Sequence, residues 1–137
     1  MTPEEIISTL QKSMIGTLGE TLGMEIILAE MGLLKGRMPV DHRTKQPFGL
    51  LHGGASVALA ETLGSIGANM LAYPDKHAVG MEINANHLRP ISDGYVTGIA
   101  KILHQGSTSH VWEIRIEDER GNLCCISRFT AAIRRNP

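Results

Sequence analysis

Residues Gly53–Ala72 read GGASVALAETLGSIGANMLA, and Glu61 is the one charged side chain among them. Apolar residues recur in this stretch at helical spacing, which predicts a helix from about Gly54 to Ala72. An ionised carboxylate among so many small and apolar neighbours costs free energy unless it is paired, hydrogen-bonded or protonated. Glu61 is therefore the best candidate in the chain for a residue that serves chemistry rather than folding.

The predicted helix has a bulky face and a small face. The bulky apolar face should pack on a sheet, and it consists of Leu59, Leu63, Ile66 and Met70. Nearly opposite lies a face that is small except for Glu61, made of Gly54, Ala58, Glu61, Ser65 and Ala68. A small face permits close approach by something else, either a ligand or a second subunit.

The segments before this helix predict one more helix and a pair of strands. Thr2-Pro3-Glu4-Glu5 has the cap, the proline and the acid of a helix start, so a short helix should follow to about Lys12. Thr21–Ala29 and Leu33–Val40 could form two paired strands. Asp41–Gly49 has no apolar period and indicates a loop.

After Tyr73 the pattern is that of β-strands throughout. In the third candidate strand, apolar and charged residues alternate from Trp112 to Glu117, as expected for a half-buried strand. Short links rich in turn residues separate the four candidates, which predicts an antiparallel meander with the long helix on one face. We therefore expect a single α+β domain over residues 1–137. The four candidate strands are His77–Leu88, Gly94–His104, Ser109–Asp118 and Leu123–Ile133.

Composition excludes several classes of function. The 137 residues carry a net charge of -1, which argues against nucleic acid as a partner because phosphate binding needs a basic surplus. The N-terminus carries acids where an export signal has bases, and the polar residues of the long helix argue against a membrane span. Cys124 and Cys125 are adjacent and would point to opposite faces of a strand, so no disulfide is expected and a reducing cytoplasm is the default location. The histidines lack zinc-ligand spacing, so no metal is expected.

The run Gln46–Ser65, QPFGLLHGGASVALAETLGS, resembles the active-site segment of hotdog-fold acyl-CoA thioesterases of the glutamate-nucleophile, 4-hydroxybenzoyl-CoA thioesterase type. The branch that it resembles most contains the 1,4-dihydroxy-2-naphthoyl-CoA thioesterases of menaquinone synthesis and the enterobactin-pathway proofreading thioesterase. The likeness covers most of the chain from about residue 36 onward. It continues through Met38–Asp41, Val79–His87, Leu103–His104 and Val111–Ile114.

This resemblance implies an antiparallel sheet wrapped around the long helix, in homodimers and usually homotetramers. It implies hydrolysis of a thioester by water, with no metal and no bound cofactor, since CoA is part of the substrate. Glu61 would be the nucleophile or general base, and Gly53 would supply the N–H of the oxyanion hole. Gln46 and His52 would hold or polarise the thioester carbonyl, and Ser65 would orient the glutamate or the attacking water.

The resemblance also implies contacts with the CoA part of the substrate. The residues that match those near the CoA nucleotide are Arg89, His104 and Ser107, and His87 is a further candidate for substrate binding. Arg89, His104 and Ser107 could equally be ordinary residues at the rim of the domain.

The spacing of Gly53 and Glu61 bears on where the site lies. Thioester hydrolysis needs a base or nucleophile and N–H donors aimed at one carbonyl group. Eight positions along one helix correspond to about 12 Å, which is too far for both residues to contact one carbonyl carbon. Either the helix starts after Gly53, or Gly53 of one chain works with Glu61 of another. We favour the second reading, an active site at a dimer interface.

Other interpretations of the same residues stay open. Glu61 could be a structural glutamate paired with an arginine. A carrier-protein thioesterase would act on the same phosphopantetheine thioester. A hotdog enoyl-CoA hydratase would use an Asp-His pair, but no aspartate lies between Asp41 and Asp75. A non-catalytic acyl-CoA sensor would carry a DNA-binding segment, for which 137 residues leave no room.

Overall fold

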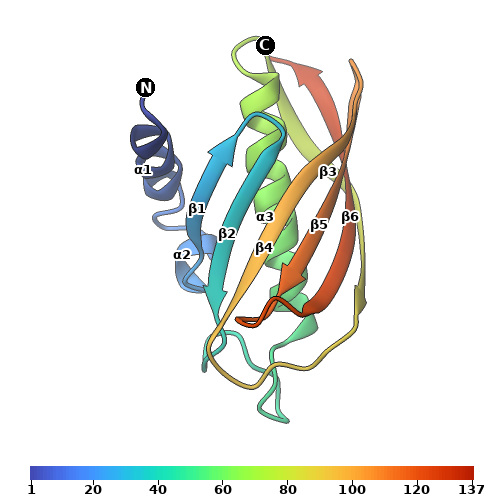
Figure 1. The fold of residues 1–137 in the computed structure, drawn as a ribbon. Helices are drawn as coiled ribbons and strands as arrows, with labels where there is room; N and C mark the ends of the chain where they lie inside the picture. The colour runs from blue at the N-terminus through green and yellow to red at the C-terminus, as the bar shows by residue number, and fades with distance from the viewer.

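In the computed structural model, which describes residues 1–137, one antiparallel sheet wraps around a long helix, α3 (Gly53–Ala72) (Figure 1). The strand order is β1-β2-β4-β5-β6-β3, and every neighbouring pair is antiparallel. This architecture confirms the expected α+β hotdog fold. The strands are β1 (Glu25–Glu30), β2 (Leu33–Pro39), β3 (Lys76–His87), β4 (Tyr95–Gln105), β5 (Ser109–Glu117) and β6 (Leu123–Arg135).

The first helix forms as its sequence predicts. α1 (Pro3–Ser13) begins with a capping box, in which the Thr2 hydroxyl accepts from the Glu5 N–H and the Glu5 carboxylate accepts from the Thr2 N–H. The expectation of a strand from Thr21 was wrong at its start. Leu18–Thr21 forms a short helix, α2, and β1 begins only at Glu25.

The expected meander holds for β4, β5 and β6 but was wrong for β3. That strand lies at the far edge of the sheet and pairs with β6, not with β4 (Figure 1). The distance to β4 is three strand spacings of about 4.8 Å each, and the seven residues Leu88–Gly94 can reach about 23 Å. A link of that length permits either a hairpin between β3 and β4 or a connection across the sheet. Here it passes β6 and β5 to reach β4.

The packing of α3 also corrects the sequence-based division into two faces. Leu59 and Leu63 are buried against the sheet as expected, but Ala68 is fully buried as well. Gly64 and Gly67 face the sheet too, because a Cβ at these positions would lie 2.6 Å from the Phe129 ring and 2.5 Å from the Trp112 ring. The small residues of α3 therefore do not all belong to the small face, because Gly64 and Gly67 make room for aromatic rings of the sheet.

The strand alternation in β5 is confirmed. Trp112, Ile114 and Ile116 are fully buried under α3, whereas Arg115 between them is exposed. Both cysteines of β6 are free and buried, and burial raises the pKa of each thiol. The two cysteines are neighbours on β6, so their side chains leave opposite faces of the strand.

The two edges of the sheet differ. The β1 edge is flanked by α1, whereas the outer edge of β3 has no neighbouring strand (Figure 1). Val79 and Met81 of β3 are 44% and 67% exposed, so this free edge carries apolar side chains. None of the helices has the length and apolar character needed to cross a lipid bilayer.

Candidate active site

Glu61 lies on the third turn of α3, half-buried against the start of β3. A Cβ added to Gly80 would be 2.7 Å from Glu61 Oε2, so the carboxylate fits because position 80 is a glycine. The register of β3 against β6 shifts at Met81, directly beside this contact. Such bulges are common next to active sites because they redirect a strand locally.

The glutamate has no ion-pair partner within the chain. The four ion pairs of the structure join Arg37 to Glu25, Arg43 to Asp41, Arg89 to Asp118 and Arg115 to Glu117. The alternative of a structural Glu61–arginine pair therefore fails for the single chain. No hydrogen bond joins Glu61 to Ser65, although the two lie one helical turn apart.

The N-terminus of α3 leaves one N–H group without an acceptor. Ala55 and Ser56 donate to the His52 carbonyl at 3.0 and 3.2 Å, and Gly54 donates to His52 Nδ1 at 2.8 Å. Gly53 N–H is the remaining donor of this first turn, and it lies at the positive end of the helix dipole. This is the donor that the sequence assigned to the oxyanion hole.

The bond from Gly54 also fixes the orientation of His52. Because Nδ1 accepts a hydrogen bond, the neutral ring carries its proton on Nε2. The side chain is exposed, so Nε2–H is available to a carbonyl oxygen outside the chain. His52 therefore has the right tautomer to polarise a thioester carbonyl.

Gln46 is oriented by its own loop in a similar way. Its Oε1 accepts from the backbone N–H groups of Phe48 and Leu50, which leaves the amide NH₂ as a free donor. Gln46 lines a cavity of about 370 Å³ together with Gly53, His87 and Arg89. The structure thus brings four of the predicted site residues to one end of α3.

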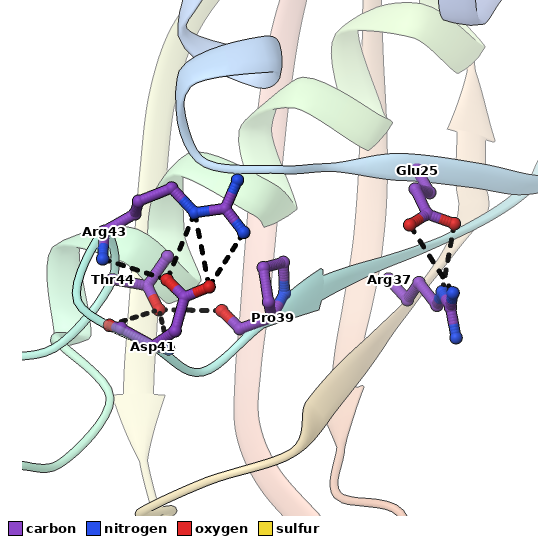
Figure 2. Close-up of polar contacts among 6 residues, drawn as sticks. All are labelled: Glu25, Arg37, Pro39, Asp41, Arg43 and Thr44. Carbon is purple, nitrogen blue, oxygen red and sulfur yellow. Dashed lines mark hydrogen bonds and ion pairs between the residues drawn. The ribbon is translucent and has the colours of Figure 1, made fainter.

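Loop 41–52, which carries Gln46 and His52, is anchored by Thr44 (Figure 2). The Thr44 side chain is buried, and its hydroxyl donates to the Pro39 carbonyl at 2.7 Å and accepts from the Asp41 N–H at 3.1 Å. The Thr44 carbonyl in turn accepts from the His52 N–H at 2.8 Å. One buried threonine therefore ties the end of β2 to the residue that caps α3.

A surface ion pair supports the same loop. Figure 2 shows the Arg43 guanidinium facing the Asp41 carboxylate. Its Nη2 lies 2.8 Å from Asp41 Oδ2, and its hydrogen bonds lower the pKa of Asp41 to about 2. The two side chains are 38% and 33% exposed, so solvent screens much of this interaction. The pair orients the loop more than it stabilises the fold.

His87 packs directly on the start of α3. A Cβ added to Gly53 would lie 2.9 Å from His87 Nε2, so a larger residue would displace the ring. The glycine keeps the backbone N–H approachable from the cavity. His87 therefore forms one wall of the space in which a carbonyl oxygen would meet Gly53.

The structure does not bring all predicted residues together. Glu61 and Ser65 do not line the cavity at Gly53, and α3 includes both Gly53 and Glu61, so the separation of about 12 Å along one helix stands. Ser107 lines a cavity with Leu71 and Ala72 at the other end of α3. Since α3 is about 30 Å long, Ser107 lies far from Gly53 within one chain. The His104 ring lies beside Gly106 in the same loop region.

Two residues that shape the candidate site were not predicted from the sequence. Gly80 was only part of a family motif, although a glycine inside a strand is a signal of close approach by another group. Thr44 gave no signal, because a threonine in a polar loop is usually solvent-exposed and only the fold shows its burial. No three His, Cys, Asp or Glu side chains of the chain gather into a possible metal site.

An antiparallel sheet wrapped around one helix, with an unpaired glutamate and a free N–H at the helix start, is the arrangement expected of a hotdog-fold thioester hydrolase. The sequence model of the thioesterase superfamily matches residues 48–125, and this chain belongs to that superfamily. Its fold is similar to those of solved structures, among them a thioesterase from Haemophilus influenzae. That structure superimposes with a TM-score of 0.90 at 42% identity, covering 98% of this chain and 92% of that one.

Curated relatives agree with the superfamily. The 1,4-dihydroxy-2-naphthoyl-CoA hydrolase of Escherichia coli is 57% identical over 100 residues, which cover 73% of this chain and 74% of the relative. The proofreading thioesterase EntH of Cronobacter turicensis is 49% identical over 127 residues, which cover 93% of each protein. The chain is therefore an enzyme that hydrolyses thioesters, as the sequence predicted.

Proposed function

We propose that the protein hydrolyses acyl-CoA thioesters, preferentially aromatic ones, with Glu61 acting on a carbonyl bound at Gly53 of a second subunit. The observation that carries this proposal is the Glu61 carboxylate, which sits in an apolar helix without any cationic partner. A chain does not stabilise itself by placing a charge there. The position is explained if the charge acts on a substrate.

The donors around Gly53 would stabilise the charge that develops on the carbonyl oxygen. Gly53 N–H points from the helix start, and the Gln46 NH₂ and His52 Nε2–H groups are free for the same oxygen. In comparable oxyanion holes, one donor contributes roughly 3–4 kcal/mol to transition-state stabilisation. Three donors at one end of α3 therefore suit acyl transfer.

Glu61 would supply the other half of the reaction. As a general base it would take a proton from water, whose oxygen attacks the carbonyl carbon and expels the CoA thiolate. As a nucleophile it would attack the carbon itself and expel the CoA thiolate, forming an anhydride that water then opens to the free acid and the Glu61 carboxylate. A single turnover in ¹⁸O-water identifies the nucleophilic route if water opens the anhydride at the Glu61 carboxyl carbon, because ¹⁸O then enters the Glu61 side chain, which the general-base route never labels.

A second copy would meet the first along β3. The free edge of this 12-residue strand exposes Val79 and Met81, and an unpaired apolar edge favours pairing with another strand. Two-fold pairing of the β3 strands would lay the two α3 helices side by side in opposite directions. Glu61 beside Gly80 would then lie near the partner's helix start, and the dimer could pair into a tetramer.

The acyl group and its carrier are proposed from the relatives. One relative is named for hydrolysis of 1,4-dihydroxy-2-naphthoyl-CoA, and others are named as proofreading thioesterases. The first favours an aromatic acyl-CoA here. The second favours an acyl group on a carrier protein, which presents the same phosphopantetheine thioester. We further propose that water is the only other reactant, without a cofactor, and that the enzyme works in the cytoplasm, where Cys124 and Cys125 stay reduced.

The test is thiol release from a panel of aromatic and aliphatic acyl-CoAs and from acyl groups on a carrier protein, with Glu61→Ala as the control. We expect turnover by the wild-type protein, highest on hydroxynaphthoyl- and hydroxybenzoyl-CoA, and none by Glu61→Ala above the uncatalysed rate. Equal turnover by the variant would overturn the role of Glu61. A preference for carrier-bound acyl groups would favour the proofreading alternative.

A further inference from the structure

A second cavity of about 540 Å³ lies between α1 and the C-terminal half of α3. Its walls are mostly apolar and include Ile6 and Leu10 of α1, Met31 of the β1–β2 turn and Met70 of α3. Figure 1 shows α1 beside β1. An apolar space of this size with few polar groups has the character of a small-molecule site.

The position of this cavity connects it to the candidate active site. Ser65 is among its lining residues, and Ser65 follows Glu61 by one helical turn on the same side of α3. Cβ atoms at this spacing are about 5–6 Å apart. An acyl group whose carbonyl carbon is in reach of Glu61 therefore enters the cavity if it extends along α3 past Ser65.

The side chains of the cavity suit a ligand of variable shape. Met1, Met31 and Met70, three of the seven methionines of the chain, contribute to its lining. Methionine side chains adapt to irregular shapes, and their sulfur atoms make favourable contacts with aromatic rings. This composition matches an aromatic or branched apolar group better than a charged one.

Helix α1 forms an outer wall that can adjust without disturbing the sheet. It is fixed at its C-terminal end, where the Gln11 side chain donates to the Met24 carbonyl at 3.0 Å and accepts from the Ile26 N–H at 2.8 Å. No residue of α1 is fully buried, and Ile6 and Leu10 are only half-buried. The wall is therefore held to β1 at one end and contacts the cavity through two side chains.

We infer that this cavity receives the acyl group of the substrate, and that Ile6 and Leu10 of α1 set the largest group it accepts. The inference rests on the proposed function, because it assumes that Glu61 acts on a thioester. It adds a specificity role for the N-terminal helix, which lies outside the matched residues 48–125.

The test compares Leu10→Trp, which fills the cavity, with Ser8→Trp, which adds the same side chain to an exposed position of α1 outside it. kcat/KM is measured for acetyl-, benzoyl- and 2-naphthoyl-CoA. For Leu10→Trp we expect the ratio of naphthoyl to acetyl activity to fall about tenfold or more, with Ser8→Trp unchanged. This ratio is independent of the fraction of protein that folds. Ile6→Ala provides the reverse variant. It is assayed in addition on an acyl-CoA larger than 2-naphthoyl-CoA, on which its kcat/KM should exceed that of the wild-type protein.

The outcomes separate the two proposals. If the wild-type protein releases no thiol from any substrate, the proposed function fails. If the wild-type is active and the ratio is the same in Leu10→Trp, the role of α1 is overturned. If Leu10→Trp loses activity on all three substrates equally and its mass by light scattering falls, the cavity is covered by a second copy, which also overturns the inference.

Discussion

Glu61 and Gly80 are matched to each other across the contact between α3 and β3, since a Cβ at position 80 would lie only 2.7 Å from Glu61 Oε2. The substitution Gly80→Ala should therefore displace the carboxylate and lower kcat by about 10- to 100-fold, because reacting groups tolerate little misplacement. It also approaches the Phe129 ring to 3.1 Å, so a loss of stability of about 1–3 kcal/mol is expected. Steady-state kinetics and urea unfolding measure the two effects. An unchanged kcat would contradict the claim that the glycine at position 80 positions the Glu61 carboxylate.

Gly53 allows a test of its backbone N–H alone. Proline is favoured at the first position of a helix, and His52 already has the extended conformation (φ -68°, ψ 129°) that a following proline requires. Gly53→Pro should thus keep α3 intact while it removes the donor, and kcat should fall about 100- to 1,000-fold.

Gly53→Ala is the matched control for that substitution. It adds a Cβ against His87, as proline does, but it retains the N–H. The difference in kcat between the two variants measures the donor. Equal kcat values would show that Gly53 contributes space rather than a hydrogen bond.

The sequence predicted the elements of this fold better than their arrangement. The helix around Glu61 and the alternation in β5 follow from local periodicity, and the observed bounds agree within a few residues. The position of β3 depends on how the seven-residue link after His87 crosses the sheet, which no local pattern encodes. For the same reason, the contacts of Gly64 and Gly67 with aromatic rings of the sheet were not predictable.

The site was predictable where a residue type is unusual in its context. A lone glutamate in an apolar helix and paired glycines at the helix start are visible in the sequence. The cavity that joins Gln46 to His87 arises from a loop and a strand that are far apart in sequence, so only the fold brings the two side chains together. Thr44 was not predictable for the same reason, because it anchors the loop only through hydrogen bonds that the fold buries.

Thr44 gives a prediction about stability. Thr44→Val keeps the size of the buried side chain but removes the hydroxyl that bonds to the Pro39 carbonyl and the Asp41 N–H. One buried and one partly buried polar group lose their partner, which should cost about 1–3 kcal/mol in the free energy of unfolding. Thr44→Ser retains the hydroxyl and should cost less than half of that. Urea titrations of the three proteins decide it, and equal losses in both variants would contradict the hydrogen-bonding role.

His110 predicts how stability depends on pH. Its side chain is 2% exposed, and burial, followed by the nearby charge of His104, lowers its pKa below the ordinary 6.5. As the pH falls through 6.5, the unfolded chain binds a proton at His110 and the folded protein does not, so stability decreases until the pH passes the folded-state pKa. Above 6.5 the residue is neutral in both states and contributes no pH dependence.

The substitution His110→Phe should remove this dependence. His110 Nδ1 has no hydrogen-bond partner, so its loss leaves no other polar group unpaired. Thermal unfolding at pH 5.0 and 7.5 should show a smaller difference between the two pH values for the variant than for the wild-type protein. The prediction is contradicted if the two proteins lose the same stability on acidification.

The shared active site leads to a prediction about mixed dimers. If Glu61 of one subunit serves the carbonyl bound at Gly53 of the other, every site in either single-variant dimer lacks one half. Glu61→Ala protein is then inactive, and Gly53→Pro protein retains at most about 1% of wild-type activity. A hybrid dimer places both lesions in one site and leaves the other site complete. Random mixing after dissociation makes half of the dimers hybrids, each with one of two sites working, so about a quarter of wild-type activity should return. Hybrids purified with two different affinity tags confirm that mixing occurred. A site contained in one chain would give two defective sites in every hybrid and no recovery, which is the outcome that the separation of about 12 Å between Gly53 and Glu61 along α3 argues against.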